Sequence, residues 1–314
     1  MELLTEADVR RLLDPVQVIA AIEEAFRLRY PDTVMPVRTQ MKVAGGVFLI
    51  MPCYDRLAHA LGMKLVKFNE NPQVAESHIQ ATYILFDADS GGARLVIPAN
   101  YLTDLRTAAT SAVATRVLAR ADSRVLGIFG TGRQARAHLR VLPLVRKFER
   151  AVVTGHDHAR ARDFAQEMSA EAALPVEAVY PRTNAAESDV LCTCTTSHTP
   201  LFDGRMLRGG AHLNLVGSFQ PQTREVDDYT IQRSRVVVDT FAGALAEAGD
   251  LLLPLRSGAI APDHLLADLH QLLSGTRPVR TSPSEITLFK SVGCALEDLA
   301  AARLLKLPGA TQPR

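Results

Sequence analysis

The sequence lacks any apolar run approaching the roughly 20 residues that a membrane-spanning helix requires. Its first six residues also lack the basic and then apolar order of a signal peptide. Neither sign of charge is in excess, because 35 lysines and arginines face 34 aspartates and glutamates, and there is no basic tract. The sequence therefore predicts a cytoplasmic protein that binds neither a membrane nor a nucleic acid.

Cysteine is scarce as well, with four residues and no C-x-x-C pair. Cys192 and Cys194 stand two apart on an expected strand and so share a face, where a pair of metal ligands is conceivable. We favour their interpretation as small buried apolar residues of a reduced protein, and we expect no metal site. The patterns G-x-S-x-G and H-E-x-x-H do not occur, which removes the strongest sequence signals for a serine hydrolase or a zinc protease.

The chain does have the length and composition of an ordinary globular protein. Its 314 residues suggest about two domains, and 47% of them are hydrophobic. Near the N-terminus, Thr5 with Asp8 forms a capping pattern, and Asp14-Pro15 predicts the start of a second helix. Four β-rich runs follow, at residues 47–50, 61–68, 79–86 and 94–97. This pattern predicts an α+β domain with a mostly antiparallel sheet.

A different rhythm begins after an alanine-rich helix expected at residues 103–119, which we interpret as a bridge between two domains. Strands and helices then alternate, which argues for a parallel, doubly wound sheet. The expected strands are residues 125–129, 151–154, 190–194, 212–216 and 235–239, and the expected helices are residues 133–145 and 159–173. We interpret residues 286–305 as one more helix.

A glycine-rich stretch lies between an expected strand and an expected helix. It reads Gly130-Thr131-Gly132-Arg133-Gln134-Ala135 and fits the pattern G-x-G-x-x-A. In a dinucleotide-binding turn, Gly130 permits the tight turn, Gly132 lets a pyrophosphate approach the backbone, and Ala135 lets the helix pack on the strand. A glycine-rich turn that binds no nucleotide is the alternative, but the order of strand, turn and helix favours a nucleotide site.

The residue that recognises the adenosine ribose is expected after the second strand of such a domain. Asp157 stands 22 residues after Ala135, close to the usual spacing. However, Gly155 occupies the strand end where an acidic residue would indicate NAD, and His156 or Arg160 would suit a 2′-phosphate. The sequence therefore leaves the choice between NADH and NADPH open.

Three cations in the first half of the chain are candidates to bind a small carboxylate. Lys64 lies on an expected strand among apolar neighbours, so its ammonium group requires an anionic partner. Arg106 falls in the first turn after an expected cap at Thr103, where the helix dipole disfavours a cation unless an anion binds there. Arg38 has no such argument. Ion pairing within the protein is the alternative for all three and the better one for Arg38, but together they would suit one carboxylate.

The chain resembles the ornithine cyclodeaminase and mu-crystallin family over nearly its whole length, through several motifs in a fixed order. These motifs are Met51-Pro52-Cys53-Tyr54, Gly62-Met63-Lys64-Leu65-Val66, Ser77-His78-Ile79-Gln80-Ala81-Thr82, Leu102-Thr103-Asp104-Leu105-Arg106-Thr107-Ala108-Ala109, Gly130 with the five residues after it, Gly217-Ser218-Phe219-Gln220-Pro221 with Arg224-Glu225, and Phe289-Lys290-Ser291-Val292-Gly293.

The resemblance implies a Rossmann-type, doubly wound parallel sheet domain and an α+β domain that binds substrate and forms a homodimer. It also implies that the C-terminal helix returns to the first domain. The expected domains are therefore residues 1–118 with 291–314, for substrate binding and dimerisation, and residues 119–290, for the dinucleotide. The expected nucleotide-binding residues are Gly130, Thr131, Gly132, Arg133, Gln134, Ala135, His156, Asp157, Gly217 and Ser218.

Arg38, Lys64 and Arg106 match the carboxylate-binding cations of the family, and Thr82 and Ser218 match positions near the substrate and the nicotinamide. The chain departs from the cyclodeaminase branch at two positions. That branch has a glutamate where this chain has Leu49 and a catalytic aspartate where it has Phe219. Since these carboxylates would serve as general bases, their absence weighs against ornithine cyclisation. The Met-Pro-Cys-Tyr, Ser-His and Gly-Ser-Phe stretches are more similar to ketimine reductases of the family.

We therefore expect an NAD(P)H-dependent reductase of cyclic imino acids, such as pyrroline-2-carboxylate or piperideine-2-carboxylate, which forms proline or pipecolate. The nicotinamide would lie at the carboxyl ends of the parallel strands and deliver hydride to the imine carbon. Lys64, Arg106 and Arg38 would hold the carboxylate, and Phe219 would form an apolar wall against the ring.

The expected catalytic residues are Lys64, Arg106 and Thr82, and either Lys64 or a water near Thr82 would keep the imine nitrogen protonated. Two alternatives stay open. One is another enzyme of the family, an ornithine cyclodeaminase or an alanine dehydrogenase. The other is a non-catalytic, crystallin-like protein that binds a nucleotide or another ligand.

Overall fold

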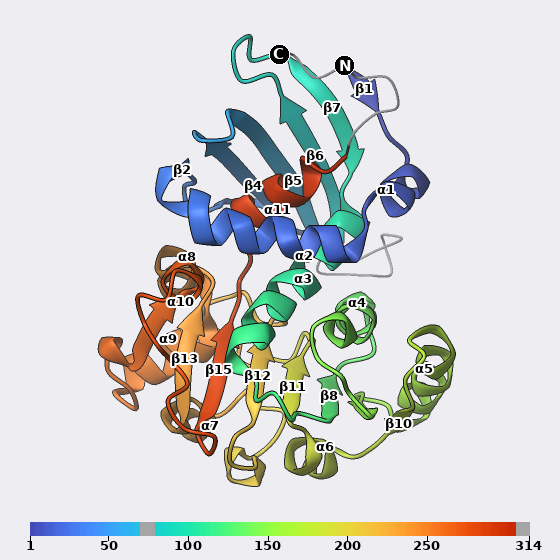
Figure 1. Ribbon diagram of the computed structural model, residues 1–314, viewed down its shortest axis with the longest axis vertical. Helices are drawn as coiled ribbons and strands as arrows, with labels where there is room; N and C mark the ends of the chain where they lie inside the picture. Colours follow the sequence, from blue (N-terminus) through green and yellow to red (C-terminus); the bar gives the residue numbers. More distant parts are fainter. Residues whose placement is uncertain (70–78, 306–314) are drawn as a thin grey trace. The chain divides into compact units, whose positions relative to one another are not determined.

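The computed structural model describes residues 1–69 and 79–305, which form two compact units. Unit 1 comprises Met1–Arg106 and Cys294–Arg314, and unit 2 comprises Thr107–Gly293. The motif that begins with Ser77-His78 starts outside the described residues. Each unit has its own sheet, as Figure 1 shows, and together they confirm the expected α/β class.

Unit 1 contains a seven-stranded sheet in the order β1-β7-β6-β5-β4-β2, with β3 paired to β4. All neighbours are antiparallel except β1 and β7. The strands are β1 (Glu2–Leu3), β2 (Thr33–Val34), β3 (Thr39–Val43), β4 (Gly46–Asp55), β5 (Ala60–Asn69), β6 (Ile79–Phe86) and β7 (Ala93–Pro98). The helices are α1 (Glu6–Leu12), α2 (Pro15–Glu24) with the π-helical turn η1 (Ala25–Arg29) and the 3₁₀ turn η2 (Tyr30–Asp32), and α11 (Ala295–Ala302).

The two faces of this sheet differ. Residues on the inner face, among them Met51, Lys64 and Tyr83, are buried, and α11 lies against this side with α2 packed on α11 (Figure 1). The alternate residues point to the other face and are only half-buried or exposed. Because side chains alternate along a strand, the register places Lys64 opposite Tyr83 and Met51 on the inner face.

The N-terminal helix signals are confirmed, since Thr5 and Asp8 form a capping box and Pro15 begins α2 behind the Asp14 cap. The expected cap at Thr103 is wrong. The helix α3 (Asn100–Leu118) begins three residues earlier, and the backbone N–H of Tyr101 donates to the Glu6 carboxylate at 3.1 Å. This partner comes from α1 and leaves no local sequence pattern. No helix of the described ranges combines the length and apolarity needed to cross a bilayer.

Unit 2 contains an eight-stranded, fully parallel sheet in the order β10-β9-β8-β11-β12-β15-β13-β14. The strands are β8 (Val125–Phe129), β9 (Arg150–Thr154), β10 (Val176–Ala178), β11 (Val190–Thr193), β12 (His212–Leu215), β13 (Ser234–Val238), β14 (Leu265–Asp268) and β15 (Ile286–Lys290). The helices are α4 (Arg133–Val141), α5 (His158–Glu171), α6 (Pro181–Glu187), α7 (Asp228–Arg233), α8 (Phe241–Glu247), α9 (Gly249–Ser257) and α10 (Leu269–Leu273), with 3₁₀ turns η3 (Leu142–Leu144), η4 (Gly204–Met206) and η5 (Pro262–His264).

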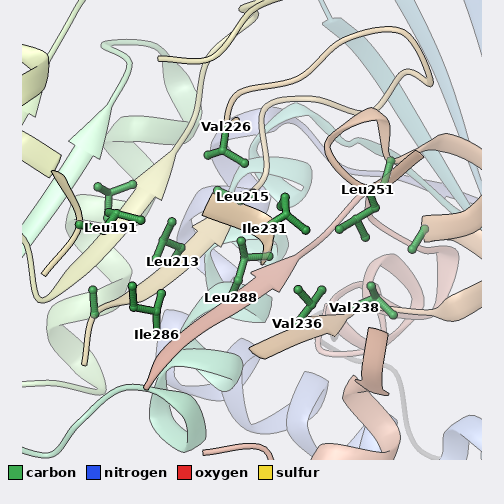
Figure 2. Close-up of a cluster of buried hydrophobic side chains, with 14 of the residues drawn as sticks. Leu191, Leu213, Leu215, Val226, Ile231, Val236, Val238, Leu251, Ile286 and Leu288 are labelled. Carbon is green, nitrogen blue, oxygen red and sulfur yellow. The ribbon is translucent and has the colours of Figure 1, made fainter. Parts of the chain in front are cut away.

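The strand order reverses at β8, the first strand of this sheet, which has β9 on one side and β11 on the other. This is the arrangement of a doubly wound Rossmann-type sheet, in which ligands bind outside the carboxyl ends of the strands at the reversal. Aliphatic side chains from the strands form the core, including Leu213 of β12 and Leu288 of β15 (Figure 2). The unit 2 sheet thus confirms the doubly wound expectation.

The helix expected at residues 286–305 is wrong in its first part. Residues Ile286–Lys290 form β15, which pairs with β12 on one side and β13 on the other, and all five are buried. A central parallel strand is apolar on both faces, so it shows no alternation, and a short apolar run of this kind is easily taken for helix. Only the second part of the segment is helical, in α11.

Candidate functional site

The glycine-rich turn follows β8 directly and has the geometry of a phosphate-binding turn. Gly130 has φ +114°, a conformation that side chains disfavour, and a Cβ there would lie 2.6 Å from the carbonyl oxygen of Cys194. Around Gly132, in contrast, a Cβ would meet no atom within 4 Å. The backbone of Gly132 is therefore open to approach by a ligand.

The first turn of α4 offers backbone N–H groups beside this opening. Gly132 is the N-cap residue and has no side chain to accept the hydrogen bonds of the first turn. Ala135 is fully buried, as expected for the residue that lets the helix pack on the sheet. Thr131, Arg133 and Gln134 are half-buried or exposed at the same turn. These residues fit the pyrophosphate of a dinucleotide.

At the end of β9, the structure gives Asp157 a local partner that the sequence pattern did not predict. Its carboxylate caps α5, accepting hydrogen bonds from the backbone N–H groups of Ala159 at 2.8 Å and Arg160 at 3.3 Å. These bonds lower the pKa of Asp157. His156 and Arg160 are exposed beside it. The role of Asp157 or His156 in ribose recognition stays a prediction, because capping alone accounts for the aspartate.

Two loops at the carboxyl ends of β11 and β12 meet at one buried carboxylate, that of Glu225. It accepts from the hydroxyl of Thr193 at 2.7 Å, and from the backbone N–H and hydroxyl of Thr195 at 2.8 and 2.7 Å. It also accepts from the backbone N–H groups of Gly217 at 2.9 Å and Ser218 at 3.2 Å. Burial and the neighbouring Asp250 raise the pKa of Glu225, whereas Lys290 and the two threonine hydroxyls lower it.

A buried lysine completes this arrangement. Lys290, the last residue of β15, donates to the carbonyl oxygen of Ser218 at 2.5 Å and pairs with Asp250 at 3.0 Å. Asp250 in turn accepts from the backbone N–H of Glu225 at 2.7 Å. The side chain of Ser218 points into its own loop and donates to the Thr223 carbonyl at 2.7 Å. The backbone of the loop after β12 is thus held by charged groups on both its N–H and C=O sides.

Unit 1 contains a buried cluster of two cations and two carboxylates. Lys64 Nζ lies 2.8 Å from Asp298 Oδ1, and Arg106 contacts Glu297 at 2.5 Å and Asp298 at 3.0 Å. All four side chains are nearly inaccessible, with Lys64 at 1% and Arg106 at 5% exposure. The expected anionic partner of Lys64 is therefore present within the protein. Arg106 lies in the second turn of α3, so the dipole argument for its anion is wrong.

The environment of this cluster shifts the protonation of Lys64. Burial, followed by the positive charge of Arg106, lowers the pKa of Lys64 to about 8, although Asp298 and Glu297 oppose the shift. Burial lowers the pKa of Arg106, but the two carboxylates outweigh it, so the net direction is upward. Lys64 is thus a cation that can lose its proton near neutral pH, and Arg106 is a permanent one.

Two buried polar atoms near the cluster have no hydrogen-bond partner among the described residues. They are the hydroxyl oxygen of Tyr83, which is directly opposite Lys64 in the sheet, and Oδ2 of Asp298. Burial and the charge of Asp298 hold the pKa of Tyr83 well above its usual range, so the hydroxyl stays a donor. An unsatisfied buried donor or acceptor costs about 1–3 kcal/mol, which a water or ligand could recover.

The remaining expected site residues are not all brought together. Thr82 is exposed and pairs with Leu65, so it lies on the opposite face of the sheet from Lys64. Arg38 is half-buried between β2 and β3. Phe219 packs against the apolar core of unit 2. The structure thus separates Thr82 from Lys64 within unit 1, because successive residues of a strand point to opposite faces.

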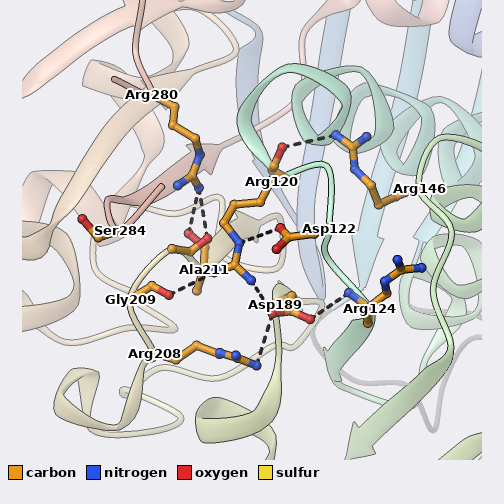
Figure 3. Close-up of polar contacts among 12 residues, drawn as sticks. Arg120, Asp122, Arg124, Arg146, Asp189, Arg208, Gly209, Ala211, Arg280 and Ser284 are labelled. Carbon is orange, nitrogen blue, oxygen red and sulfur yellow. Dashed lines mark hydrogen bonds and ion pairs between the residues drawn. The ribbon is translucent and has the colours of Figure 1, made fainter. Parts of the chain in front are cut away.

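The amino ends of the same parallel strands are also held by a buried carboxylate, that of Asp189. It accepts from the backbone N–H groups of Arg124 at 2.8 Å and Val125 at 3.0 Å, and it pairs with Arg120 and Arg208 (Figure 3). These contacts lie at the edge away from the glycine-rich turn. Within the described residues, no three histidine, cysteine, aspartate or glutamate side chains are grouped to hold a metal ion.

Sequence reasoning missed the acidic partners in both units. Glu297 and Asp298 lie in the first turn of α11, where acidic residues are common for helix-dipole reasons and usually face solvent. Their position in the sequence therefore did not indicate that these two side chains are buried. Glu225 and Lys290 were part of quoted motifs, but no pattern of spacing indicated that they converge on the loop at Ser218.

Comparisons with known proteins agree over the whole chain. The model of the ornithine cyclodeaminase/mu-crystallin family matches residues 1–306. The chain is 35% identical over 315 residues to a Delta(1)-pyrroline-2-carboxylate reductase of Bacillus cereus, covering 97% of this chain and 95% of the relative. It is 35% identical over 280 residues to the ketimine reductase mu-crystallin of Mus musculus, covering 88% and 86%.

A solved structure is similar to both units at once. It is the Delta(1)-pyrroline-2-carboxylate reductase of Thermococcus litoralis in complex with NADH and L-proline. The TM-score is 0.94 and the sequence identity is 36%, and the alignment covers 97% of this chain and 96% of the other. The similarity therefore extends to the unit with the buried cation cluster as well as to the unit with the glycine-rich turn.

Proposed function

Because the chain belongs to the ornithine cyclodeaminase/mu-crystallin family, we propose that it is an NAD(P)H-dependent reductase of cyclic imino acids. The substrates are 1-pyrroline-2-carboxylate or its six-membered homologue, and the products are proline or pipecolate. The observation that carries this proposal is the full-length likeness to a reductase that was solved with NADH and L-proline. The geometry of each unit supports it independently.

Unit 2 supplies a site that fits a dinucleotide. The open backbone at Gly132 and the uncapped first turn of α4 would bind the pyrophosphate through N–H groups. A bound reduced nicotinamide supplies the hydride that reduces the carbon of the C=N bond. Gly217 and Ser218 offer the ordered backbone of the loop after β12 to the same ligand. Asp157 caps α5, and His156 and Arg160 are exposed beside it. Because these residues do not choose between the two cofactors, activity has to be measured with both NADH and NADPH.

Unit 1 supplies charges for the substrate carboxylate. Within the buried cluster, Lys64 and Arg106 are balanced by Glu297 and Asp298, so a further carboxylate requires a further cation. Arg38 would provide it. We propose that these three cations orient the acid, and that the unsatisfied Oδ2 of Asp298 accepts an N–H of the ligand or of a bridging water.

The proton on the imine nitrogen is a second requirement, because a protonated imine accepts hydride far better than a neutral one. We propose Lys64 as the group that keeps it protonated, since the pKa of Lys64 is lowered to about 8, close to the pH at which the enzyme would work. The alternative, a water near Thr82, is less favoured because Thr82 lies on the other face of the sheet.

Two residues argue against ornithine cyclisation. Leu49 is buried on the inner face, two residues before Met51, and Phe219 packs on an apolar core. Neither side chain can remove a proton, so the positions at which the cyclodeaminase branch has carboxylates provide no general base. Reduction of a preformed imine requires positioning of the reactants and does not need those carboxylates.

We also propose that the protein is a cytoplasmic homodimer. The outer face of the unit 1 sheet carries half-buried apolar side chains on three neighbouring strands, namely Phe48, Ile50, Leu61, Met63, Leu65, Ile84 and Phe86. An apolar sheet face that stays accessible usually marks an interface, and a second copy of the chain would cover it. The mass in solution, measured by light scattering after gel filtration, tests this. The four free cysteines suit a reducing compartment.

A panel of initial rates tests the proposed reaction. Purified protein is given 1-pyrroline-2-carboxylate, 1-piperideine-2-carboxylate, pyruvate with ammonia, or ornithine, each with NADH or NADPH, or with NAD⁺ for ornithine. We expect loss of nucleotide absorbance with the cyclic imines. Release of ammonia from ornithine would contradict the interpretation of Leu49 and Phe219, and no turnover of any substrate would favour a binding protein.

A further inference from the structure

The buried carboxylate of Glu225 has no part in the reaction proposed above, yet it joins two loops at the ligand-binding edge of the sheet. We propose that Glu225 is a positioning residue that shapes the nicotinamide side of the nucleotide site, with Lys290 as its partner. The inference rests on the proposed function, because it concerns the same nucleotide. It adds a residue whose effect is confined to one half of that nucleotide.

Glu225 accepts hydrogen bonds from three backbone N–H groups where the two loops meet. One carboxylate oxygen accepts from the N–H of Thr195, and the other accepts from the N–H groups of Gly217 and Ser218. The loops approach so closely that a Cβ on Gly217 would overlap the carbonyl oxygen of Thr195. Two loops packed this tightly need an acceptor between them that takes several N–H groups at once, and a carboxylate can do so.

Lys290 adds the opposite contact on the same peptide segment. Its ammonium group donates to the carbonyl of Ser218, while Glu225 accepts from the N–H of that residue. Asp250 holds Lys290 and also accepts from the N–H of Glu225. The peptide groups of Ser218 are thus fixed in direction as well as in position. A ligand that binds to this loop would meet backbone groups that are already oriented.

The place of this arrangement in the sheet indicates which part of the nucleotide it serves. The glycine-rich turn follows β8, and β9 and β11 flank β8 on opposite sides. A dinucleotide lies across the strand ends, so with the pyrophosphate at Gly132 one half extends over β9 and the other over β11 and β12. The adenosine side belongs to β9, where His156 and Asp157 lie. The Glu225 loops are therefore on the nicotinamide side, and Gly130 adjoins them at the Cys194 carbonyl.

Substitution of Glu225 by glutamine tests this assignment without a change in side-chain size. The amide retains one acceptor oxygen, so at least one backbone N–H of the two loops loses its partner. Affinities for NADH and for ADP-ribose, which lacks the nicotinamide, are measured by titration calorimetry. NADPH and 2′-phospho-ADP-ribose are measured in parallel. We expect Glu225→Gln to weaken binding of the complete nucleotide about tenfold or more and to change ADP-ribose binding by no more than about twofold.

Asp189 provides a matched control. It is also a buried carboxylate that accepts two backbone N–H groups, but at the amino ends of β8 and β11. In Asp189→Asn, the ratio of the affinity for NADH to the affinity for ADP-ribose should be the same as in the wild type. Equal losses for NADH and ADP-ribose in Glu225→Gln, or no loss of either, would overturn the proposal. So would a nicotinamide-specific loss in Asp189→Asn.

A second variant serves if Glu225→Gln does not fold. Thr193→Val removes one hydroxyl donor to Glu225, at 2.7 Å, and leaves the backbone N–H groups that bind this carboxylate in place. It should produce a smaller loss, about two- to fivefold, again only for the complete nucleotide, and an unchanged ratio would overturn the proposal. If the wild type binds neither NADH nor NADPH, the proposed function itself fails. If the wild type binds the nucleotide and the variant binds it equally well, only the role of Glu225 fails.

Discussion

The two units use buried carboxylates in different ways. In unit 1, Glu297 and Asp298 face the charged side chains of Lys64 and Arg106, and Glu297 also accepts from the backbone N–H of Cys294. In unit 2, Glu225 accepts hydrogen bonds from three backbone N–H groups and two hydroxyls, and a Cβ at Gly132 would meet no atom within 4 Å. The buried carboxylates of unit 1 thus pair with side-chain charges, whereas Glu225 of unit 2 mainly fixes backbone groups.

This difference has consequences for what each unit tolerates. A cluster of paired charges depends on the number and the protonation of its members, so single side-chain changes and pH should affect unit 1 strongly. A site made of backbone depends on the space around the chain and on its dihedral angles. Unit 2 should therefore respond to glycine replacements and to loss of the carboxylates that shape its loops.

The largest effect is expected for Asp298→Ala. This change leaves the ammonium group of Lys64 buried without its carboxylate at 2.8 Å and removes the contact of Arg106 with Asp298. Loss of one partner of a buried pair costs about 3–5 kcal/mol of unfolding free energy, measurable by urea denaturation.

The exposed pair of Arg136 and Glu167 is the control for this prediction. Glu167→Gln should cost less than about 1 kcal/mol, because solvent screens pairs at the surface. If the two variants lose similar amounts of stability, the charges of unit 1 are not held as tightly as their burial implies.

Arg106→Lys is expected to have the next largest effect, this time on catalysis. The substitution keeps the charge but loses the fork of donors that contacts Glu297 and Asp298 and would orient the substrate carboxylate. We expect kcat/KM for the cyclic imine to fall by about 2–3 kcal/mol of transition-state stabilisation, roughly 30- to 150-fold. Nucleotide affinity should stay the same. A parallel loss of nucleotide binding would show that Arg106 acts on the other ligand.

Gly132→Val should have the opposite effect to Arg106→Lys, because it should weaken nucleotide binding. Its side chain enters the open space where the pyrophosphate is proposed to bind, so nucleotide affinity should fall by about 1.5–3 kcal/mol, measured by titration calorimetry. Stability should hardly change, since nothing lies within 4 Å of the new Cβ and φ at Gly132 is −91°. Gly130→Val is the contrast, because its φ of +114° and the nearby Cys194 carbonyl oppose any side chain. Wild-type nucleotide affinity in Gly132→Val would remove the phosphate site from this turn.

The sequence predicted the glycine-rich turn of unit 2 because the signals for this turn are local. The strand at residues 125–129, the glycine pair and the helix at Arg133 follow one another directly, and each was found. The missed strand Ile286–Lys290 lies between β12 and β13, which are far from it in the chain, and its five buried residues show no alternation.

The charged cluster shows a different limit. The apolar surroundings of Lys64 predicted an anionic partner, but its identity was not predictable, because Asp298 is 234 residues away in the chain. For the same reason the start of α3 was placed at Thr103, since the partner of its first turn is Glu6 of another helix. A pattern can thus indicate that a charge needs a partner, whereas only the fold determines which residue provides it.

The smallest effect expected is a change in pH dependence, and it separates the two units most directly. The pKa of Lys64 is about 8, below its ordinary value, so the side chain is protonated at pH 7 and loses its proton as the pH rises through 8. If that proton is required, kcat/KM should fall about tenfold per pH unit above pH 8, or 1.4 kcal/mol per unit. Nucleotide affinity should stay flat over the same range, because the backbone of Gly132 does not titrate. Lys64→Arg keeps the positive charge throughout, so this decline should disappear even though the rate at pH 7 is lower. If the variant shows the same decline at the same pH, the titrating group is the imine of the substrate, and Lys64 then serves unit 1 only as a fixed charge.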